Sequence, residues 1–220
     1  MRMLPWVMRV FIGVGLFAGA AVAEENSGYL GNNYSKLQDV KSPSGEKAKR
    51  WLAPDMTPGK YDKMLLEKTV LFPEPAGTDQ VSTATLKEIT SYLDEALRRE
   101  LGGVIQLVTE PGPKTLRVKP AITAAAAKEQ GLKPRELIPV ALVRAAAKKA
   151  TGNRAKEAKI AVEYELRDAQ SNDLVGAGMR EGTGRKLDKP NDRVTLADFK
   201  PVIDEWAKDA RVFFQPKPKQ

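Results

Sequence analysis

Glu163 and Glu165 form the carboxylate pair in this sequence whose spacing best suits chemistry. They lie two residues apart in a run that alternates apolar and polar residues, so both would point to one face of a strand. Paired carboxylates can share general acid and general base work, as they do in glycoside hydrolases. Lys159 and Arg167 share the same face, which is typical of a solvated strand surface. We therefore expect no catalytic residues here, and a carboxylate-dependent enzyme acting on glycan is the alternative.

Two glycine-rich motifs are similar to loops that hold phosphate groups. They are Gly176-Ala177-Gly178 and Gly182-Thr183-Gly184, but neither completes a dinucleotide-binding fingerprint or a Walker A sequence, and no helix follows directly. A hairpin that needs backbone freedom explains these glycines more simply. The motifs therefore predict no cofactor site.

The composition removes most familiar catalytic and metal-binding groups. The 220 residues contain neither cysteine nor histidine. Without cysteine there are no disulfides, thiolate nucleophiles, cysteine-ligated metals or lipids attached through cysteine. Without histidine there is no Ser-His-Asp triad and no histidine-ligated metal site. We expect a protein that is not an enzyme and that holds no metal and no cofactor.

Residues 1–23 have the three zones of a secretory signal peptide. Arg2 and Arg9 form a basic start, Val10–Ala20 is apolar, and Ala21-Val22-Ala23 is a small-residue cleavage site. The apolar stretch is shorter than the roughly 20 residues that a membrane-spanning helix needs. We predict cleavage between Ala23 and Glu24, no transmembrane segment afterwards, and a periplasmic location that allows peripheral association with the outer membrane. An uncleaved N-terminal anchor is the weaker alternative.

The formal net charge of +8 leaves open an anionic partner. An exported cation can meet lipopolysaccharide phosphates, anionic lipid head groups or acidic glycans. The basic residues are dispersed along the chain, however, which favours ordinary surface charge. Nucleic acid binding is not expected, because aromatic and basic residues do not interleave. An anion-binding or lipopolysaccharide-binding envelope protein stays as an alternative.

After the signal peptide, the pattern divides the chain into three parts. Residues 24–59 are polar with scattered aromatic anchors and predict an extended N-terminal arm. Residues 60–214 predict a globular domain, and residues 215–220 a flexible tail. The first candidates for partner binding are all in the arm: Tyr29, Tyr34, Arg50 and Trp51.

Hydrophobic periodicity predicts an α/β (α+β) domain in which about five strands and three amphipathic helices alternate in the order β-α-β-β-α-β-β-α. Pro120 should lie at a sheet edge or a bulge. Gly182 to Asp192 is predicted to be a polar loop, and Trp206, although a conceivable ligand platform with Trp51, falls on a core-facing helix stripe. The predicted strands are 63–72, 104–109, 115–123, 159–168 and 174–180. The predicted helices are 83–101, 136–150 and one that extends from its cap at Thr195 to residue 213. Ser82 or Thr83 is predicted to cap the first helix.

A series of short motifs runs through the sequence in a fixed order: Ser27-Gly28-Tyr29-Leu30 with Tyr34 and Leu37, Arg50-Trp51, Tyr61-Asp62-Lys63, Leu116-Arg117-Val118 with Ala121-Ile122-Thr123, Glu163-Tyr164-Glu165-Leu166-Arg167-Asp168, and Trp206-Ala207. In this order the motifs resemble a family of bacterial exported proteins known as domain of unknown function 3313, many of them described as lipoproteins. The resemblance implies an envelope location and supplies no catalytic residues. This sequence has Ala21-Val22-Ala23 where a lipidated cysteine would be required.

Together these features favour a non-enzymatic periplasmic domain that binds an envelope protein, lipid or glycan. Export, the missing catalytic residue types and the aromatic arm carry this expectation.

Overall fold

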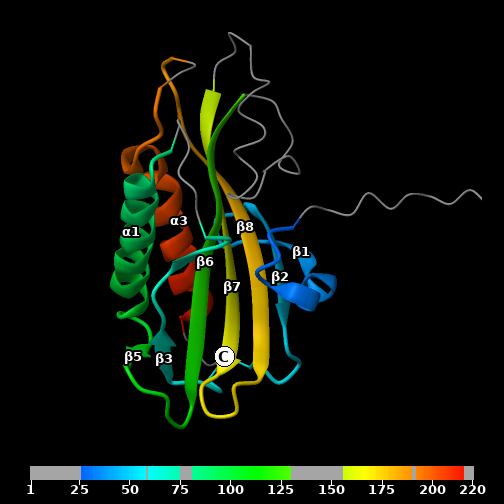
Figure 1. Ribbon diagram of the computed structural model, residues 1–220. Coiled ribbons are helices and arrows are strands. Elements are labelled where there is room, and N and C mark those ends of the chain that lie inside the picture. Colours follow the sequence, from blue (N-terminus) through cyan, green and yellow to red (C-terminus); the bar gives the residue numbers. More distant parts are fainter. Residues whose placement is uncertain (1–25, 58, 75–80, 130–155, 190–191, 216–220) are drawn as a thin grey trace, which may run out of the picture.

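The computed structural model describes residues 26–57, 59–74, 81–129, 156–189 and 192–215. These residues form one sheet with helices packed against it (Figure 1). The elements are η1 (Gly31–Lys36), β1 (Gln38–Lys41), β2 (Lys47–Leu52), β3 (Lys63–Leu66), β4 (Val70–Leu71), α1 (Thr83–Leu101), β5 (Gln106–Leu107), β6 (Thr115–Glu129), β7 (Lys156–Asp168), β8 (Leu174–Lys186) and α3 (Leu196–Phe214).

The sheet has eight strands and is mixed. Its order is β1-β2-β8-β7-β6-β3-β5, with β4 paired to β6 beyond the end of β3. Strands β1, β2, β8, β7 and β6 pair antiparallel in that order across the sheet. Strands β3, β4 and β5 pair parallel to their neighbours. The α+β class is confirmed, but the prediction of about five strands is wrong. The predicted strand 63–72 is divided into β3 and β4, and the predicted strand 104–109 is reduced to β5.

The N-terminal segment differs from the extended arm that its composition predicts. It contains η1 followed by the β1–β2 hairpin, whose turn holds Gly45 at a φ of +89°. β2 pairs with β8, so that Arg50 lies opposite Gly178 and Trp51 opposite Ala177. The hairpin therefore extends the sheet, because the polar segment gains backbone hydrogen bonds that its composition does not reveal.

Pro120 lies inside the sheet, and its predicted place at an edge or a bulge is wrong. It belongs to β6, which pairs with β7 on one side and with β3 and β4 on the other. The β3 pairing ends at Val118 and the β4 pairing begins at Ala121. Pro120 thus falls where the neighbouring chain breaks from the ladder, and the register shift occurs further on, between Ile122 and Ala124.

The predicted polar loop from Gly182 to Asp192 is wrong in its first part, because β8 continues to Lys186; the described residues between Lys186 and Thr195 belong to no helix or strand. A Cβ atom at Gly184 would lie 2.1 Å from the carbonyl oxygen of Asp198, and one at Gly182 would lie 2.3 Å from Val202. These glycines therefore let α3 cross close over β8. Their role is close packing of a helix on a strand, which a sequence motif alone does not distinguish from a loop.

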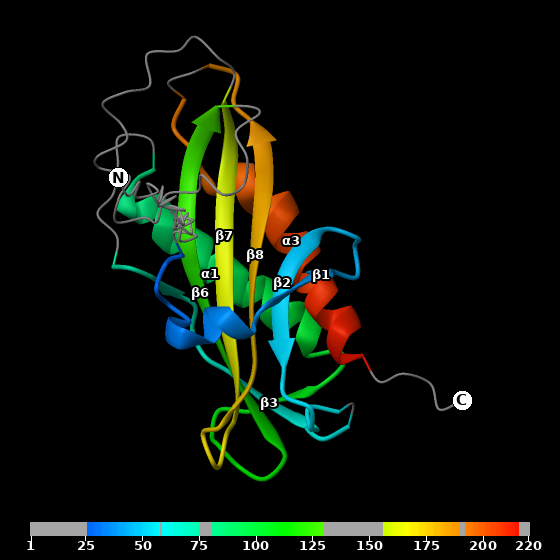
Figure 2. The same cartoon turned by 90° about the vertical axis from the view of Figure 1, so that its right-hand side faces the viewer.

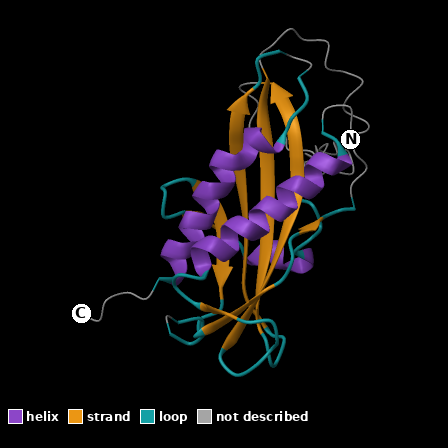
Figure 3. Ribbon diagram, turned by 90° about the vertical axis from the view of Figure 1, so that its left-hand side faces the viewer, coloured by secondary structure: helices purple, strands orange, loops and turns teal. Residues whose placement is uncertain are grey.

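Both long helices begin at the caps that the sequence predicts. The hydroxyl of Ser82 accepts a hydrogen bond from the backbone N–H of Thr85, and Thr195 forms a capping box with Asp198. Helices α1 and α3 lie side by side on one face of the sheet (Figures 2 and 3). The predicted helix 136–150 lies outside the described residues.

We call the sheet face that carries Ile160 and Val162 the helix face, and the face that carries Glu163 the opposite face. The helix face packs against α1 and α3, and η1 lies over the opposite face (Figure 2). The core between sheet and helices forms two clusters, one around Ile89, Ile160 and Phe199 and one around Met64, Leu116 and Leu166. None of the helices in the described ranges is long and apolar enough to cross a membrane.

Candidate functional site

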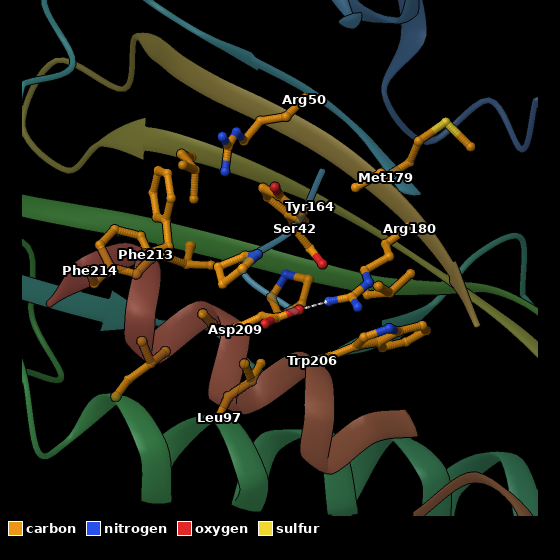
Figure 4. Close-up of a pocket in the computed structure, with 18 of the residues that line it drawn as sticks. Ser42, Arg50, Leu97, Tyr164, Met179, Arg180, Trp206, Asp209, Phe213 and Phe214 are labelled. Carbon is orange, nitrogen blue, oxygen red and sulfur yellow. Dashed lines mark hydrogen bonds and ion pairs between the residues drawn. The ribbon is translucent and has the colours of Figure 1, made fainter. Parts of the chain in front are cut away.

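A cavity of about 150 Å³ lies on the helix face, bounded by the sheet, the two long helices and the β1–β2 hairpin and partly open to solvent (Figure 4). Its wall draws on both core clusters, including Leu93 and Val162 from the first and Leu101 and Leu166 from the second. The cavity therefore occupies the place where two well-packed regions meet without filling the space between them. Most of the lining side chains are aliphatic or aromatic.

The hairpin side of the cavity is closed by a buried ion pair. Arg180 on β8 donates from Nη1 to Oδ2 of Asp209 on α3 at 2.5 Å, and each residue is only 8% exposed. Nη2 donates to Glu205 at 2.7 Å and to the Ser44 hydroxyl at 3.1 Å, and Ser44 in turn donates to Asp209 at 2.8 Å. Ser44 lies in the β1–β2 turn. The network thus joins the hairpin, β8 and α3, and it neutralises the charge of Arg180.

Two donors at the cavity wall are buried without a partner among the described residues: Nε of Arg180 and Nε1 of Trp206. Trp206 is 6% exposed and its ring lies 5.8 Å from the guanidinium carbon of Arg180. Trp206 belongs to the core, as its place in the helix stripe predicts. Buried donors in native proteins are rarely left unpaired, so these two need an explanation.

Arg50 and Tyr164 form the polar part of the sheet wall. The Arg50 guanidinium lies 4.7 Å from the centre of the Phe213 ring, and no carboxylate of the described residues is within ion-pair distance of it. Figure 4 shows the side chains of Arg50 and Tyr164 projecting toward the cavity from neighbouring parts of the sheet. Within the described ranges, Arg50 is thus a cation beside apolar groups without a counter-charge.

Gly178 gives Tyr164 its position. It lies between Tyr164 on β7 and Arg50 on β2, and a Cβ atom there would be 2.4 Å from the Tyr164 hydroxyl. The tyrosine therefore folds across β8 toward Arg50. Burial raises the pKa of Tyr164, while the charges of Arg50 and Arg180 act in the opposite direction. The hydroxyl remains protonated at neutral pH and can donate a hydrogen bond.

The opposite face holds the acidic pair that the sequence singles out. Glu163 is only 2% exposed and accepts a hydrogen bond from the Tyr34 hydroxyl at 2.5 Å, and Glu165 pairs with Arg167 at 2.9 Å. The predicted solvated strand surface is therefore wrong for Glu163, because the segment around η1 covers it. Neither glutamate lines the cavity.

Tyr29 and Tyr34 attach the N-terminal segment to this face. The Tyr34 hydroxyl contacts Ser27 at 2.9 Å in addition to Glu163, and the Tyr29 hydroxyl donates to the carbonyl oxygen of Lys119 at 3.1 Å. Burial raises the pKa of both tyrosines to about 12; the hydrogen bond to Glu163 adds to this for Tyr34, and the charge of Glu165 does so for Tyr29. These side chains have internal partners.

The structure divides the four predicted binding residues between the two faces. Arg50 lines the cavity, whereas Trp51, the next residue in β2, has its ring 4.7 Å from the Lys36 ammonium of η1. Tyr29 and Tyr34 lie with Trp51 on the opposite face. Alternation along β2 separates Arg50 from Trp51, and partner binding by these residues stays a prediction. The predicted cleavage-site residues Ala21, Ala23 and Glu24 lie outside the described residues.

Sequence reasoning did not find the cavity. Its residues come from eight helices and strands, and only the tertiary fold brings these elements together. The sequence does hold one indication of the ion pair at its wall. Glu205 and Asp209 are four residues apart in the predicted last helix, and two like charges at this spacing repel unless a cation lies between them. In the part of the chain that the structure describes, no group of three or more acidic, histidine or cysteine side chains could hold a metal ion.

Comparison with known proteins places this fold in a family. The uncharacterised lipoprotein YdcL of Escherichia coli K12 is 34% identical over 190 residues, which cover 86% of this chain and 85% of YdcL. Two solved structures resemble this chain more distantly. A PelC dodecamer from Paraburkholderia phytofirmans has 12% identity and a TM-score of 0.37, covering 74% of this chain and 98% of that one. A minor lipoprotein from Acinetobacter baumannii has 16% identity and a TM-score of 0.38, covering 69% of this chain and 91% of that one. Residues 25–210 match the family described as a protein of unknown function, DUF3313, which confirms the resemblance seen in the sequence. The chain belongs to the DUF3313 family.

Proposed function

We propose that this protein is an exported, non-enzymatic domain of the bacterial cell envelope that binds the apolar part of a ligand in the cavity on its helix face. The observation that carries the proposal is the cavity itself, about 150 Å³ of space left between two packed core clusters. A preformed, mostly apolar cavity with a few polar groups is the usual form of a small-molecule site.

Export is proposed from residues 1–23 and from the relatedness to YdcL, which is described as a lipoprotein. We propose cleavage between Ala23 and Glu24 and release into the periplasm, because no cysteine is present in these 220 residues to carry a lipid. Fractionation of cells and the intact mass of the purified protein test this. A cytosolic protein that still begins at Met1 would contradict it.

The cavity size limits what can bind. A cavity of about 150 Å³ in another protein holds a benzene molecule. A chain of about six to eight carbon atoms is therefore the largest apolar group expected to enter without rearrangement. Of the four residues predicted for partner binding, Arg50 is the one that contacts this ligand in our proposal.

A series of straight-chain alcohols tests the proposal by isothermal titration calorimetry. Affinity should rise about fourfold with each added methylene, since each buried CH₂ contributes about 0.8 kcal/mol. The rise should stop when the chain fills the cavity. No binding of any alcohol up to 1-octanol would contradict the proposal.

A cavity-filling substitution provides the matched variant. Ala210 lines the cavity from α3, so Ala210→Leu should occupy the space and weaken 1-octanol binding at least about tenfold. Lys208→Leu places the same side chain on the exposed side of the same helix and should leave binding unchanged. Equal effects of the two substitutions would show that the alcohol binds elsewhere.

The alternative of a glycan-cleaving enzyme receives no support from the geometry. Such an enzyme needs its two carboxylates at an accessible site on either side of the scissile bond. Glu163 is instead buried beneath Tyr34, and Glu165 is held by Arg167. We propose that Glu163 fixes the N-terminal segment to the sheet and that Glu165 forms an ion pair along β7.

A further inference from the structure

We infer that the ligand of the cavity is an amphiphile whose aliphatic tail ends in an anionic group, and that Arg50 and Tyr164 bind that group. The inference rests on the proposed function and adds the chemical class of the ligand.

The first step is the difference between the two arginines of the cavity wall. Arg180 is bonded to Asp209 and Glu205, so its charge is already balanced within the protein. Arg50 has no carboxylate partner among the described residues and lies against Phe213. A guanidinium on an aromatic ring keeps its edge free for a carboxylate or phosphate, to which it can donate two parallel hydrogen bonds.

The second step is the hydroxyl of Tyr164. It lines the same cavity and has no hydrogen-bond partner within the described ranges. Cross-strand pairing through Gly178 brings it to the Arg50 side of β8. A hydroxyl donor beside a guanidinium suits an acceptor that carries negative charge.

The third step is the direction of the ligand. Arg50 and Tyr164 belong to the sheet wall, whereas Leu93, Leu97 and Leu101 of α1 form an apolar wall. A tail directed toward α1 would place its charged end at Arg50. An uncharged apolar molecule would instead leave Arg50 beside the ligand without a counter-charge.

The test compares three ligands of equal tail length: octanoate, octyl phosphate and 1-octanol. At neutral pH and low salt, both anions should bind the wild-type protein at least about tenfold more tightly than 1-octanol, because a charge pair at a partly desolvated site is added. Raising the salt concentration should reduce this advantage. The ratio of the two anions then distinguishes a fatty acid from a phosphate-bearing lipid as the natural source.

Arg50→Gln is the variant that isolates the charge. It should remove the advantage of octanoate over 1-octanol, so that octanoate affinity falls at least about tenfold more than 1-octanol affinity does. Octanoate and 1-octanol binding equally well to the wild-type protein would overturn the inference and leave the proposed function standing. A loss of 1-octanol binding in Arg50→Gln equal to that of octanoate would also overturn it, because Arg50 would then act through packing. Failure of all three ligands to bind would reject the proposed function itself.

Discussion

Different elements pack on the two faces of the sheet. The helix face is covered by two amphipathic helices and retains a cavity, at whose wall two buried donors have no partner among the described residues. On the opposite face, the residues around η1 cover a buried acid, Glu163, and Tyr34 bonds it directly. On the opposite face, Glu163 therefore has a protein partner in Tyr34. On the helix face, the cavity and the donors of Arg180 and Trp206 have no such partner among the described residues. This contrast is why we place ligand binding on the helix face and a structural role on the opposite face.

Removal of the buried carboxylate on the helix face should have the largest effect on stability. Asp209→Ala leaves the buried guanidinium of Arg180 with one carboxylate partner, that of Glu205, so the free energy of unfolding should fall by about 3 kcal/mol or more. Glu205 is 43% exposed at its side chain, so Glu205→Ala should lower it by about 1 kcal/mol or less. Denaturant unfolding of both variants measures the difference, and equal losses would contradict the asymmetry.

Crowding the contact between β8 and α3 should have the next largest effect. Gly184→Ala places a methyl group 2.1 Å from the Asp198 carbonyl oxygen, and the strain should lower the free energy of unfolding by about 2–3 kcal/mol. Gly103→Ala is the control, because its Cβ would meet nothing closer than 3.8 Å. If Gly184→Ala is no less stable than Gly103→Ala, α3 does not pack on β8 as described.

On the opposite face, Tyr34→Phe should lower the free energy of unfolding by about 2 kcal/mol, since a buried carboxylate loses its donor. Tyr29→Phe loses a bond to a neutral backbone carbonyl, so about 1 kcal/mol is expected. Thermal or denaturant unfolding compares the two. A smaller loss for Tyr34→Phe than for Tyr29→Phe would mean that Glu163 has another donor in solution.

The same tyrosines should make the opposite face sensitive to alkali. Their pKa values are about 12 in the folded protein and 10.0 in the absence of the fold. Above pH 10 the unfolded chain therefore loses these protons first, and their contribution to stability declines as the pH rises toward 12. The difference in stability between the wild-type protein and Tyr34→Phe should shrink over this range. A difference independent of pH would contradict the raised pKa of Tyr34.

Local pattern predicted the elements that local chemistry controls. The Ser82 cap, the Thr195–Asp198 capping box and the alternation of β7 follow from residues near one another in sequence. The pairing of β2 with β8 depends on partners more than a hundred residues away in the sequence. The extension of β8 past Gly182 depends on α3, about twenty residues further along the chain. Arg50 was predicted as a binding residue, but its neighbours in the cavity could not be, because tertiary packing alone brings Phe213 and Tyr164 to it.

The most direct test of the account is to locate a bound apolar chain by nuclear Overhauser effects between 1-octanol and protein methyl groups. Binding in the cavity predicts contacts to Leu97 on α1 and to Val118 on β6, which line it from opposite sides. Contacts confined to methyl groups away from the lining, such as those of Leu86 in the first core cluster, would contradict the assignment of this cavity as the ligand site.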